Sequence, residues 1–157
     1  MTSDDTLGVA DIREILRLLP HRYPFLLIDR VIDIRGDQHG IGIKNLTINE
    51  PFLARSAENL VIPGVLVIEG MAQTACVLTL RSLPPTDRRR FGYFMTLDKA
   101  KFRKPAGPGD TLEYHLDKLA NRRNMWWYRG EAKVGGILVA ETELSAYLVE
   151  LNPTDTP

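Results

Sequence analysis

The feature that most constrains the fold is an apolar stretch of roughly 16 to 18 residues that follows Pro63 and Gly64 and begins at Val65. A helix that is apolar on every face belongs in a protein core rather than on a surface. The stretch is at the short edge of what a membrane span needs, and it lacks basic flanking residues. The sequence therefore predicts a buried central helix that ends near Leu83, and no membrane span.

One acid, Glu69, lies inside this stretch, and Gln73 follows one helical turn later on the same face. A buried ionised carboxylate is costly unless it is paired or used, although such an acid taken alone is more often structural than catalytic. The backbone N–H groups of the first helical turn, at Gly64 and Val65, are free to hold a carbonyl oxygen. Together these features indicate half of an active site.

The composition predicts one soluble domain over residues 1–157, with a core at about 11–150 and polar tails at both ends. Lys+Arg and Asp+Glu both number 20, so there is no overall field that would attract nucleic acid. A single cysteine excludes an internal disulfide and a cysteine-rich metal site, and nothing in the sequence suggests a metal or organic cofactor. The N-terminal residues do not resemble a signal peptide, so we expect a cytoplasmic protein.

The remaining periodicity indicates an α+β fold. A short helix is expected over residues 11–19, capped by Asp11 and ended by Pro20. Residues 49–62 are expected to form a connecting loop. Strands are expected at 25–34, 39–48, 91–102, 111–119, 125–134 and 137–150. An antiparallel sheet that curls around the central helix would cover it. Six strands give an all-apolar helix too little cover, which predicts a dimer or a higher oligomer.

Four blocks of residues, taken together, resemble a known family. They span Leu19–Val31, Lys44–Phe52, Pro63–Gln73 and Lys99–Asp110. In this order and spacing they are similar to the (3R)-hydroxyacyl-[acyl carrier protein] dehydratases of bacterial type II fatty acid synthesis. The resemblance implies a hot-dog fold, in which the sheet wraps the central helix, and a homodimer with active sites at the subunit interface. It also implies a substrate held as a thioester of acyl carrier protein or coenzyme A.

The same resemblance implies roles for individual residues. Glu69 matches the catalytic acid of the family, and Gln73 matches the residue that orients groups beside it. Gly64 and Val65 match the backbone that receives the thioester oxygen. His21 matches a family position outside the catalytic residues.

The sequence departs from the family at the catalytic base, which is a histidine in a Gly-His-Phe-Pro-Gly motif shortly before the central helix. The corresponding segment, residues 51–64, contains no histidine and is one residue shorter. The position of the family histidine therefore falls on Arg55 or Ser56. Arginine stays protonated, and serine needs an activating base of its own. Glu58 is a conceivable substitute carboxylate.

Basic residues at Arg88, Lys101, Arg103 and Lys104 are either a solvated face or a docking surface for an acidic carrier protein. Three functional hypotheses remain. The first is a dehydratase with a replaced base. The second is a non-catalytic paralogue that binds acyl chains or forms a hetero-oligomer with an active homologue. The third is a hot-dog acyl thioesterase.

Overall fold

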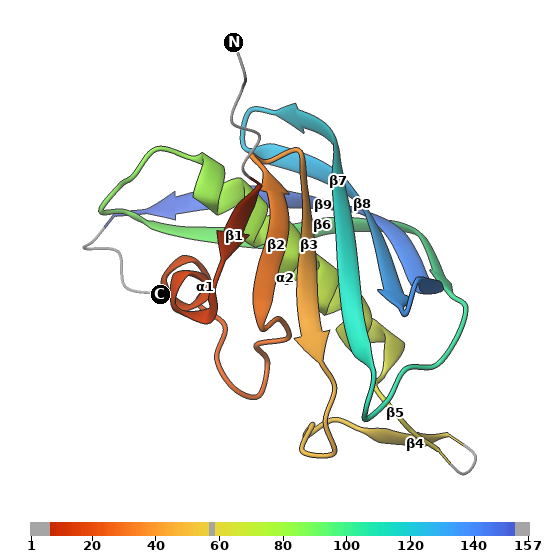
Figure 1. Ribbon diagram of the computed structural model, residues 1–157. Helices are drawn as coiled ribbons and strands as arrows, with labels where there is room; N and C mark the ends of the chain where they lie inside the picture. The colour runs from red at the N-terminus through yellow and green to blue at the C-terminus, as the bar shows by residue number, and fades with distance from the viewer. Residues whose placement is uncertain (1–6, 57–58, 153–157) are drawn as a thin grey trace.

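The computed structural model describes residues 7–56 and 59–152. One antiparallel sheet curls around a long helix, α2 (Gly64–Ser82), as Figure 1 shows. The sheet has seven strands in the order β1-β2-β3-β7-β8-β9-β6. Their bounds are β1 Gly8–Ala10, β2 Arg30–Arg35, β3 His39–Asn45, β6 Arg89–Phe102, β7 Thr111–Arg122, β8 Met125–Val134 and β9 Ile137–Leu151. A short helix, α1 (Ile12–Leu18), follows β1. The predicted α+β hot-dog arrangement is confirmed.

Helix α2 is apolar because the sheet surrounds it. Twelve of its 19 residues are buried, and its neighbours lie on β3, β7, β8 and β9. Its length and composition would suit a membrane span, but 67% of its most apolar window is buried inside the protein. The helix lies so close to the sheet that glycine is needed at the contacts: a Cβ on Gly42 would lie 2.1 Å from Thr74 Oγ1, and one on Gly70 would lie 2.3 Å from Cζ of Tyr114.

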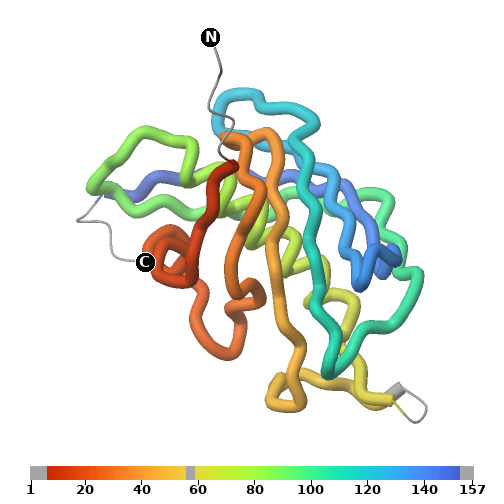
Figure 2. Tube along the Cα trace, viewed as in Figure 1, coloured from red at the N-terminus to blue at the C-terminus, as the bar shows by residue number. Residues whose placement is uncertain are grey.

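Three segments differ from the sequence-based expectation. Residues 25–29 are not a strand, because the side chain of Gln73 binds the backbone of Phe25 and Leu27 in place of a neighbouring strand. Residues 8–10, expected in a loose tail, form the edge strand β1, which is too short to show periodicity. The expected loop at 49–62 contains a hairpin of β4 (Ala54–Ser56) and β5 (Asn59–Val61). Figure 2 shows this segment extending beyond the end of the sheet.

Strand β6 forms one edge of the sheet and pairs only with β9 among the described strands. It is 14 residues long, and nearly all of its side chains are exposed. Several of these side chains are large and apolar, namely Tyr93, Phe94, Met95, Leu97 and Phe102. A long exposed apolar edge strand is a surface on which another chain can pair.

We expect Gly42→Ala to lower the free energy of unfolding by about 1–3 kcal/mol, because the new methyl group would overlap Thr74. Chemical denaturation measures the change. Gly92→Ala is the matched control, since its added Cβ would meet its nearest atom, Sγ of Cys76, at 3.3 Å. Equal stability of the two variants would contradict the close approach of α2 to β3.

Candidate active site

Glu69 lies on the second turn of α2, and its side chain is 25% exposed. Its Oε1 atom accepts a hydrogen bond from Nε2 of Gln73 at 3.0 Å. The same oxygen lies 3.4 Å from Nε2 of His21. The second carboxylate oxygen, Oε2, has no hydrogen bond or ion pair within the described residues. Glu69 is therefore held through one oxygen, while the other is left for a ligand.

The amide of Gln73 joins α2 to the segment that precedes β2. Its Nε2 donates to Glu69 and, at 2.7 Å, to the carbonyl oxygen of Phe25. Its Oε1 accepts from the backbone N–H of Leu27 at 2.8 Å. The side chain is almost fully buried, and an amide can satisfy donors and acceptors at once. Gln73 thus fixes both the carboxylate of Glu69 and the chain opposite it.

His21 is the site residue that the sequence did not place. It lies in the irregular segment after α1, and its ring is 31% exposed on the side of Glu69. Its Nδ1 atom is buried and has no hydrogen-bond partner among the described residues. The neighbouring Arg22 fixes the backbone here by donating to the carbonyl oxygens of Leu16, Leu19 and His21 at 2.7–2.9 Å. Only its place between Pro20 and Pro24, in one of the family blocks, could have signalled an ordered histidine.

The N-terminus of α2 opens onto a groove of about 420 Å³. Gly64 and Val65 line it, opposite Phe102, Arg103 and Lys104. The N–H groups of Leu66 and Val67 donate to the carbonyl oxygen of Pro63, and no described side chain caps those of Gly64 and Val65, which line the groove. Glycine is required at position 64, because a Cβ there would lie 2.5 Å from the ring of Phe102. Glu69 is not among the residues that line this groove, so the protomer does not join the two predicted half-sites in one cavity.

The two candidates for the missing histidine lie on β4, in the projecting hairpin (Figure 1). Arg55 is exposed on this strand, and its backbone faces Leu60 of β5. Ser56 ends the strand, opposite Asn59. Arg55 makes no hydrogen bond or ion pair with Glu69 in the described part of the chain, and the side chain of Ser56 lies outside it. Glu58, the conceivable substitute, lies outside the described residues.

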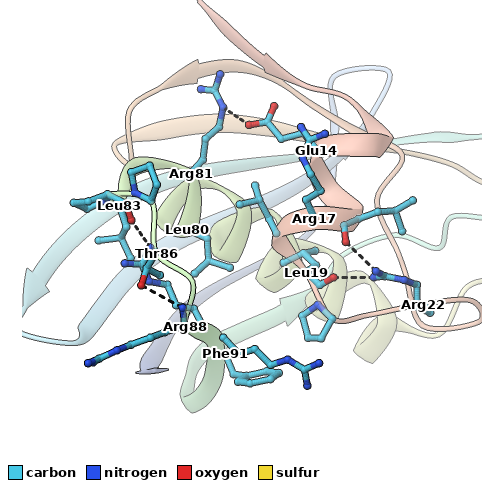
Figure 3. A pocket seen from close by; sticks show the side chains of 17 residues that line it. Glu14, Arg17, Leu19, Arg22, Leu80, Arg81, Leu83, Thr86, Arg88 and Phe91 are labelled. Carbon is cyan, nitrogen blue, oxygen red and sulfur yellow. Dashed lines mark hydrogen bonds and ion pairs between the residues drawn. The ribbon is translucent and has the colours of Figure 1, made fainter. Parts of the chain in front are cut away.

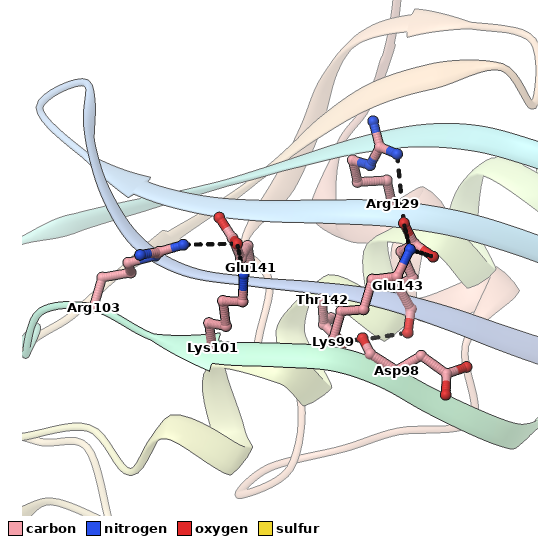
Figure 4. A network of polar contacts seen from close by, with 8 residues as sticks. All are labelled: Asp98, Lys99, Lys101, Arg103, Arg129, Glu141, Thr142 and Glu143. Carbon is pink, nitrogen blue, oxygen red and sulfur yellow. Dashed lines mark hydrogen bonds and ion pairs between the residues drawn. The ribbon is translucent and has the colours of Figure 1, made fainter.

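The predicted docking residues fall into two separate places. On the outer side of β6, Lys101 and Arg103 contact Glu141 at 3.6 and 2.9 Å, and Lys99 and Arg129 contact Glu143 at 3.1 and 3.4 Å. Figure 4 shows this ladder of ion pairs. Hydrogen bonds from Arg103 and Lys99 lower the pKa of Glu141 and Glu143, respectively, so both remain ionised. Arg88 lies instead beyond the C-terminal end of α2, 3.8 Å from Glu150.

The described residues contain no cluster of three or more His, Cys, Asp or Glu side chains that could hold a metal ion. Cys76 packs against the core, where burial raises the pKa of its thiol to about 12 and makes it a poor nucleophile. The chemistry available on this part of α2 is therefore proton transfer at Glu69, beside a histidine and an amide, with N–H donors at the helix start.

Replacing Gln73 by leucine would leave the backbone of Phe25 and Leu27 without partners. We expect Gln73→Leu to lower the free energy of unfolding by about 2–4 kcal/mol. Gln38→Leu, which removes an exposed amide, should change it by less than about 0.5 kcal/mol. Urea denaturation of both variants measures this, and a Gln73→Leu protein as stable as the control would show that the amide does not anchor the segment.

Comparison with known proteins identifies a family. The model of the FabA-like domain matches residues 19–143. A 3-hydroxyacyl-[acyl-carrier-protein] dehydratase FabZ of Rhodopseudomonas palustris (strain BisB18) is 54% identical over 151 residues, which cover 96% of this chain and all of the relative. A protein of the same description from Methylobacterium nodulans is 57% identical over 152 residues, covering 95% of this chain and 96% of the relative.

Solved structures share the fold at low sequence identity. The dehydratase heterocomplex ApeI:P from Xenorhabdus doucetiae matches with a TM-score of 0.72 at 22% identity, over 89% of this chain and 92% of the other. A hypothetical thioesterase with coenzyme A from Streptococcus pneumoniae TIGR4 matches with a TM-score of 0.59 at 10% identity, over 78% and 86% of the two chains.

Proposed function

The chain belongs to the family of FabA-like domains, and from this premise we propose that it is a 3-hydroxyacyl-[acyl-carrier-protein] dehydratase that serves fatty acid biosynthesis. The observation that carries the proposal is the contact of Glu69 with Gln73 and His21, on the helix that also carries the uncapped N–H groups of Gly64 and Val65. We place the protein in the cytoplasm. This location is supported by a fold whose long apolar helix is buried inside the sheet.

Dehydration of a 3-hydroxyacyl thioester has three requirements. A base removes a proton from C2, and the C2–H electrons form the double bond to C3. The C3–O bond breaks, and the leaving hydroxyl takes a proton and departs as water. Donors at the thioester carbonyl make the C2 proton more acidic by stabilising the negative charge on oxygen.

We assign the proton transfers to Glu69. The buried Nδ1 of His21 has no partner in the described structure, which favours the tautomer that carries its proton on Nε2. That N–H and the amide of Gln73 both face Oε1 of Glu69 and hold this oxygen in place. Oε2 then takes the proton from C2 and passes it to the leaving hydroxyl, which returns Glu69 to its starting state. In this scheme His21 is a positioning residue, and no histidine is needed at Arg55 or Ser56.

The thioester carbonyl is assigned to the N–H groups of Gly64 and Val65 at the start of α2, beside the groove lined by Phe102 and Arg103. Because Glu69 does not line this groove within one protomer, we propose that a second copy completes each site. The exposed apolar edge of β6 is the surface on which that copy would pair, since extending the sheet there satisfies its backbone and covers its side chains.

The other two hypotheses are not favoured. The dehydratase relatives share more than half of the aligned residues with this chain, whereas the structure described as a thioesterase is only 10% identical to it. The heterocomplex structure is 22% identical, which is a likeness of fold. Assembly with a histidine-bearing homologue therefore remains an outcome of the experiments below.

Variants of Glu69 and His21 test the assignment of roles. We expect Glu69→Gln to lower kcat by a factor of about 10² to 10⁴. His21→Gln keeps an N–H donor near the position of Nε2 and should retain activity within about threefold, whereas His21→Met should lose about tenfold or more. Enoyl thioester formation from a 3-hydroxyacyl thioester is the readout. Equal losses in the two His21 variants would contradict the positioning role, and a fully active Glu69→Gln protein would remove Glu69 from the mechanism.

A charge on the edge strand tests the assembly. Leu97 of β6 is 49% exposed, and Leu119 of β7 is 45% exposed, so the two leucines form a matched pair. We expect Leu97→Lys to weaken self-association at least about tenfold, because burial of the apolar side chain is replaced by burial of a charge. Leu119→Lys should leave it unchanged. Sedimentation equilibrium measures both, and a Leu97→Lys protein that associates like the unmodified chain would place the interface elsewhere.

A further inference from the structure

A second groove, of about 710 Å³, lies between α1, the C-terminal end of α2 and the start of β6. Figure 3 shows its side chains, which come from these three parts of the chain. Six of them are arginines: Arg17, Arg22, Arg81, Arg88, Arg89 and Arg90. We call this feature the arginine groove.

The arginine groove concentrates positive charge in a chain that has none overall. Its lining contains six arginines and one acid, Glu14, which gives a formal charge of +5. The whole chain has 20 basic and 20 acidic residues and is formally neutral. Such a local excess of one sign attracts and orients a partner of the opposite charge.

Some of these arginines are committed to the fold, and others are not. Nε of Arg81 donates to Glu14 at 3.0 Å, and Nε of Arg90 donates to Glu150 at 2.7 Å. The exposed side chains of Arg17 and Arg89 make no hydrogen bond or ion pair within the described residues. The first group holds the groove in shape, and the second is available to bind an anion.

The floor of the arginine groove is apolar. Leu19, Leu80, Leu83 and Phe91 are among its lining residues; the first two are buried in the core, and Leu83 and Phe91 are half-buried. An apolar floor inside a charged rim is the arrangement of a protein–protein docking surface, where the rim steers and the floor is buried. A free phosphate or a nucleotide would pair with the charges and leave Leu83 and Phe91 partly exposed to water.

The two basic surfaces of this protein differ in how far their charge is neutralised. In the ladder of Figure 4, every cation among Lys99, Lys101, Arg103 and Arg129 contacts Glu141 or Glu143. An acidic partner that bound there would have to displace or face those carboxylates. In the arginine groove, Arg81, Arg88 and Arg90 also contact Glu14 or Glu150, but Arg17 and Arg89 contact no carboxylate within the described residues, so charge complementarity favours the groove.

The groove borders the segment that carries His21, although His21 and Glu69 do not line it. Arg22 lines it, and Nη1 of Arg22 donates to the backbone oxygen of His21 at 2.7 Å. Nε2 of His21 in turn lies 3.4 Å from Glu69. A partner that contacts Arg22 in the groove would therefore bind directly next in sequence to His21, which faces the carboxylate of Glu69.

We propose that the arginine groove is the docking surface for the acidic carrier protein that delivers the acyl thioester. The proposal rests on the proposed dehydratase function and adds to it the place where the carrier binds. Arg17 and Arg89 make the ion pairs with the carrier, and Leu83 and Phe91 receive its apolar side chains.

The test compares one acyl group on two carriers. A 3-hydroxyacyl group is supplied either on an acidic acyl carrier protein or on free pantetheine, which lacks the protein. In the double variant Arg17→Glu/Arg89→Glu, we expect kcat/KM for the protein-bound substrate to fall about tenfold or more, mainly through KM. For the pantetheine thioester it should stay within about twofold. The Kd of the carrier protein, measured by fluorescence anisotropy at low salt, should rise in parallel.

The matched control is Arg30→Glu/Arg35→Glu on β2, which makes the same change in net charge at two exposed arginines whose side chains make no hydrogen bond or ion pair within the described residues. It should leave both substrates and the Kd unchanged. An equal loss in the control, an equal loss on both substrates, or an unchanged Kd in the groove variant would overturn the proposal. So would a loss of carrier binding in Lys99→Glu/Lys101→Glu that the groove variant does not show. If the unmodified protein binds the carrier but turns over neither substrate, the proposed function is wrong. The Kd values of the variants would still test the docking proposal in that case.

Discussion

The buried amide of Gln73 is the interaction on which the candidate site depends. It binds the backbone of Phe25 and Leu27, which lie 48 and 46 residues away in the sequence, respectively, and the carboxylate of Glu69 on its own helix. One side chain therefore sets the distance between α2 and the segment after α1, and so brings His21 next to Glu69. Because these groups are shielded from water, each hydrogen bond is costly to leave unmade, and the arrangement is fixed before any substrate arrives.

The parts of the fold that follow from periodicity could be predicted, and the parts that follow from a single long-range contact could not. The apolar run after Gly64 specifies α2, and alternation specifies β7, β8 and β9, because burial on one face imposes a repeat on the sequence. Residues 25–29 carry strand-like residues, yet the side chain of Gln73 on α2 binds the backbone of two of them, Phe25 and Leu27. The place of His21 beside Glu69 depends on that same contact, and no local pattern reports it. The roles of Glu69, Gln73, Gly64 and Val65 stay predictions that the geometry supports.

The basic residues are a second feature whose surroundings could not be predicted from the sequence. Basic residues at 88–90 and 99–104 look alike along the chain, but the fold treats them differently. Glu141 and Glu143, about forty residues further on, neutralise the second group across the β6–β9 pairing. The first group joins Arg17 and Arg22 in a groove with a single acid in its lining. Glu150 contacts Arg88 and Arg90, but Arg17 and Arg89 contact no carboxylate within the described residues. A formally neutral chain can thus carry one fully compensated and one partly compensated basic surface, and the second favours an acidic partner.

The central claim is that this chain removes water from a 3-hydroxyacyl thioester without a histidine in its shortened loop. The most direct measurement is incubation of the purified protein, with no other subunit present, with a 3-hydroxyacyl carrier protein, followed by the mass of the carrier. We expect the acyl thioester to remain on the carrier protein and the mass of the carrier to fall by one water. An unchanged mass, with water lost only after the histidine motif is restored, would contradict dehydration by the unmodified chain. Release of a free acid would show that the chain hydrolyses the thioester instead.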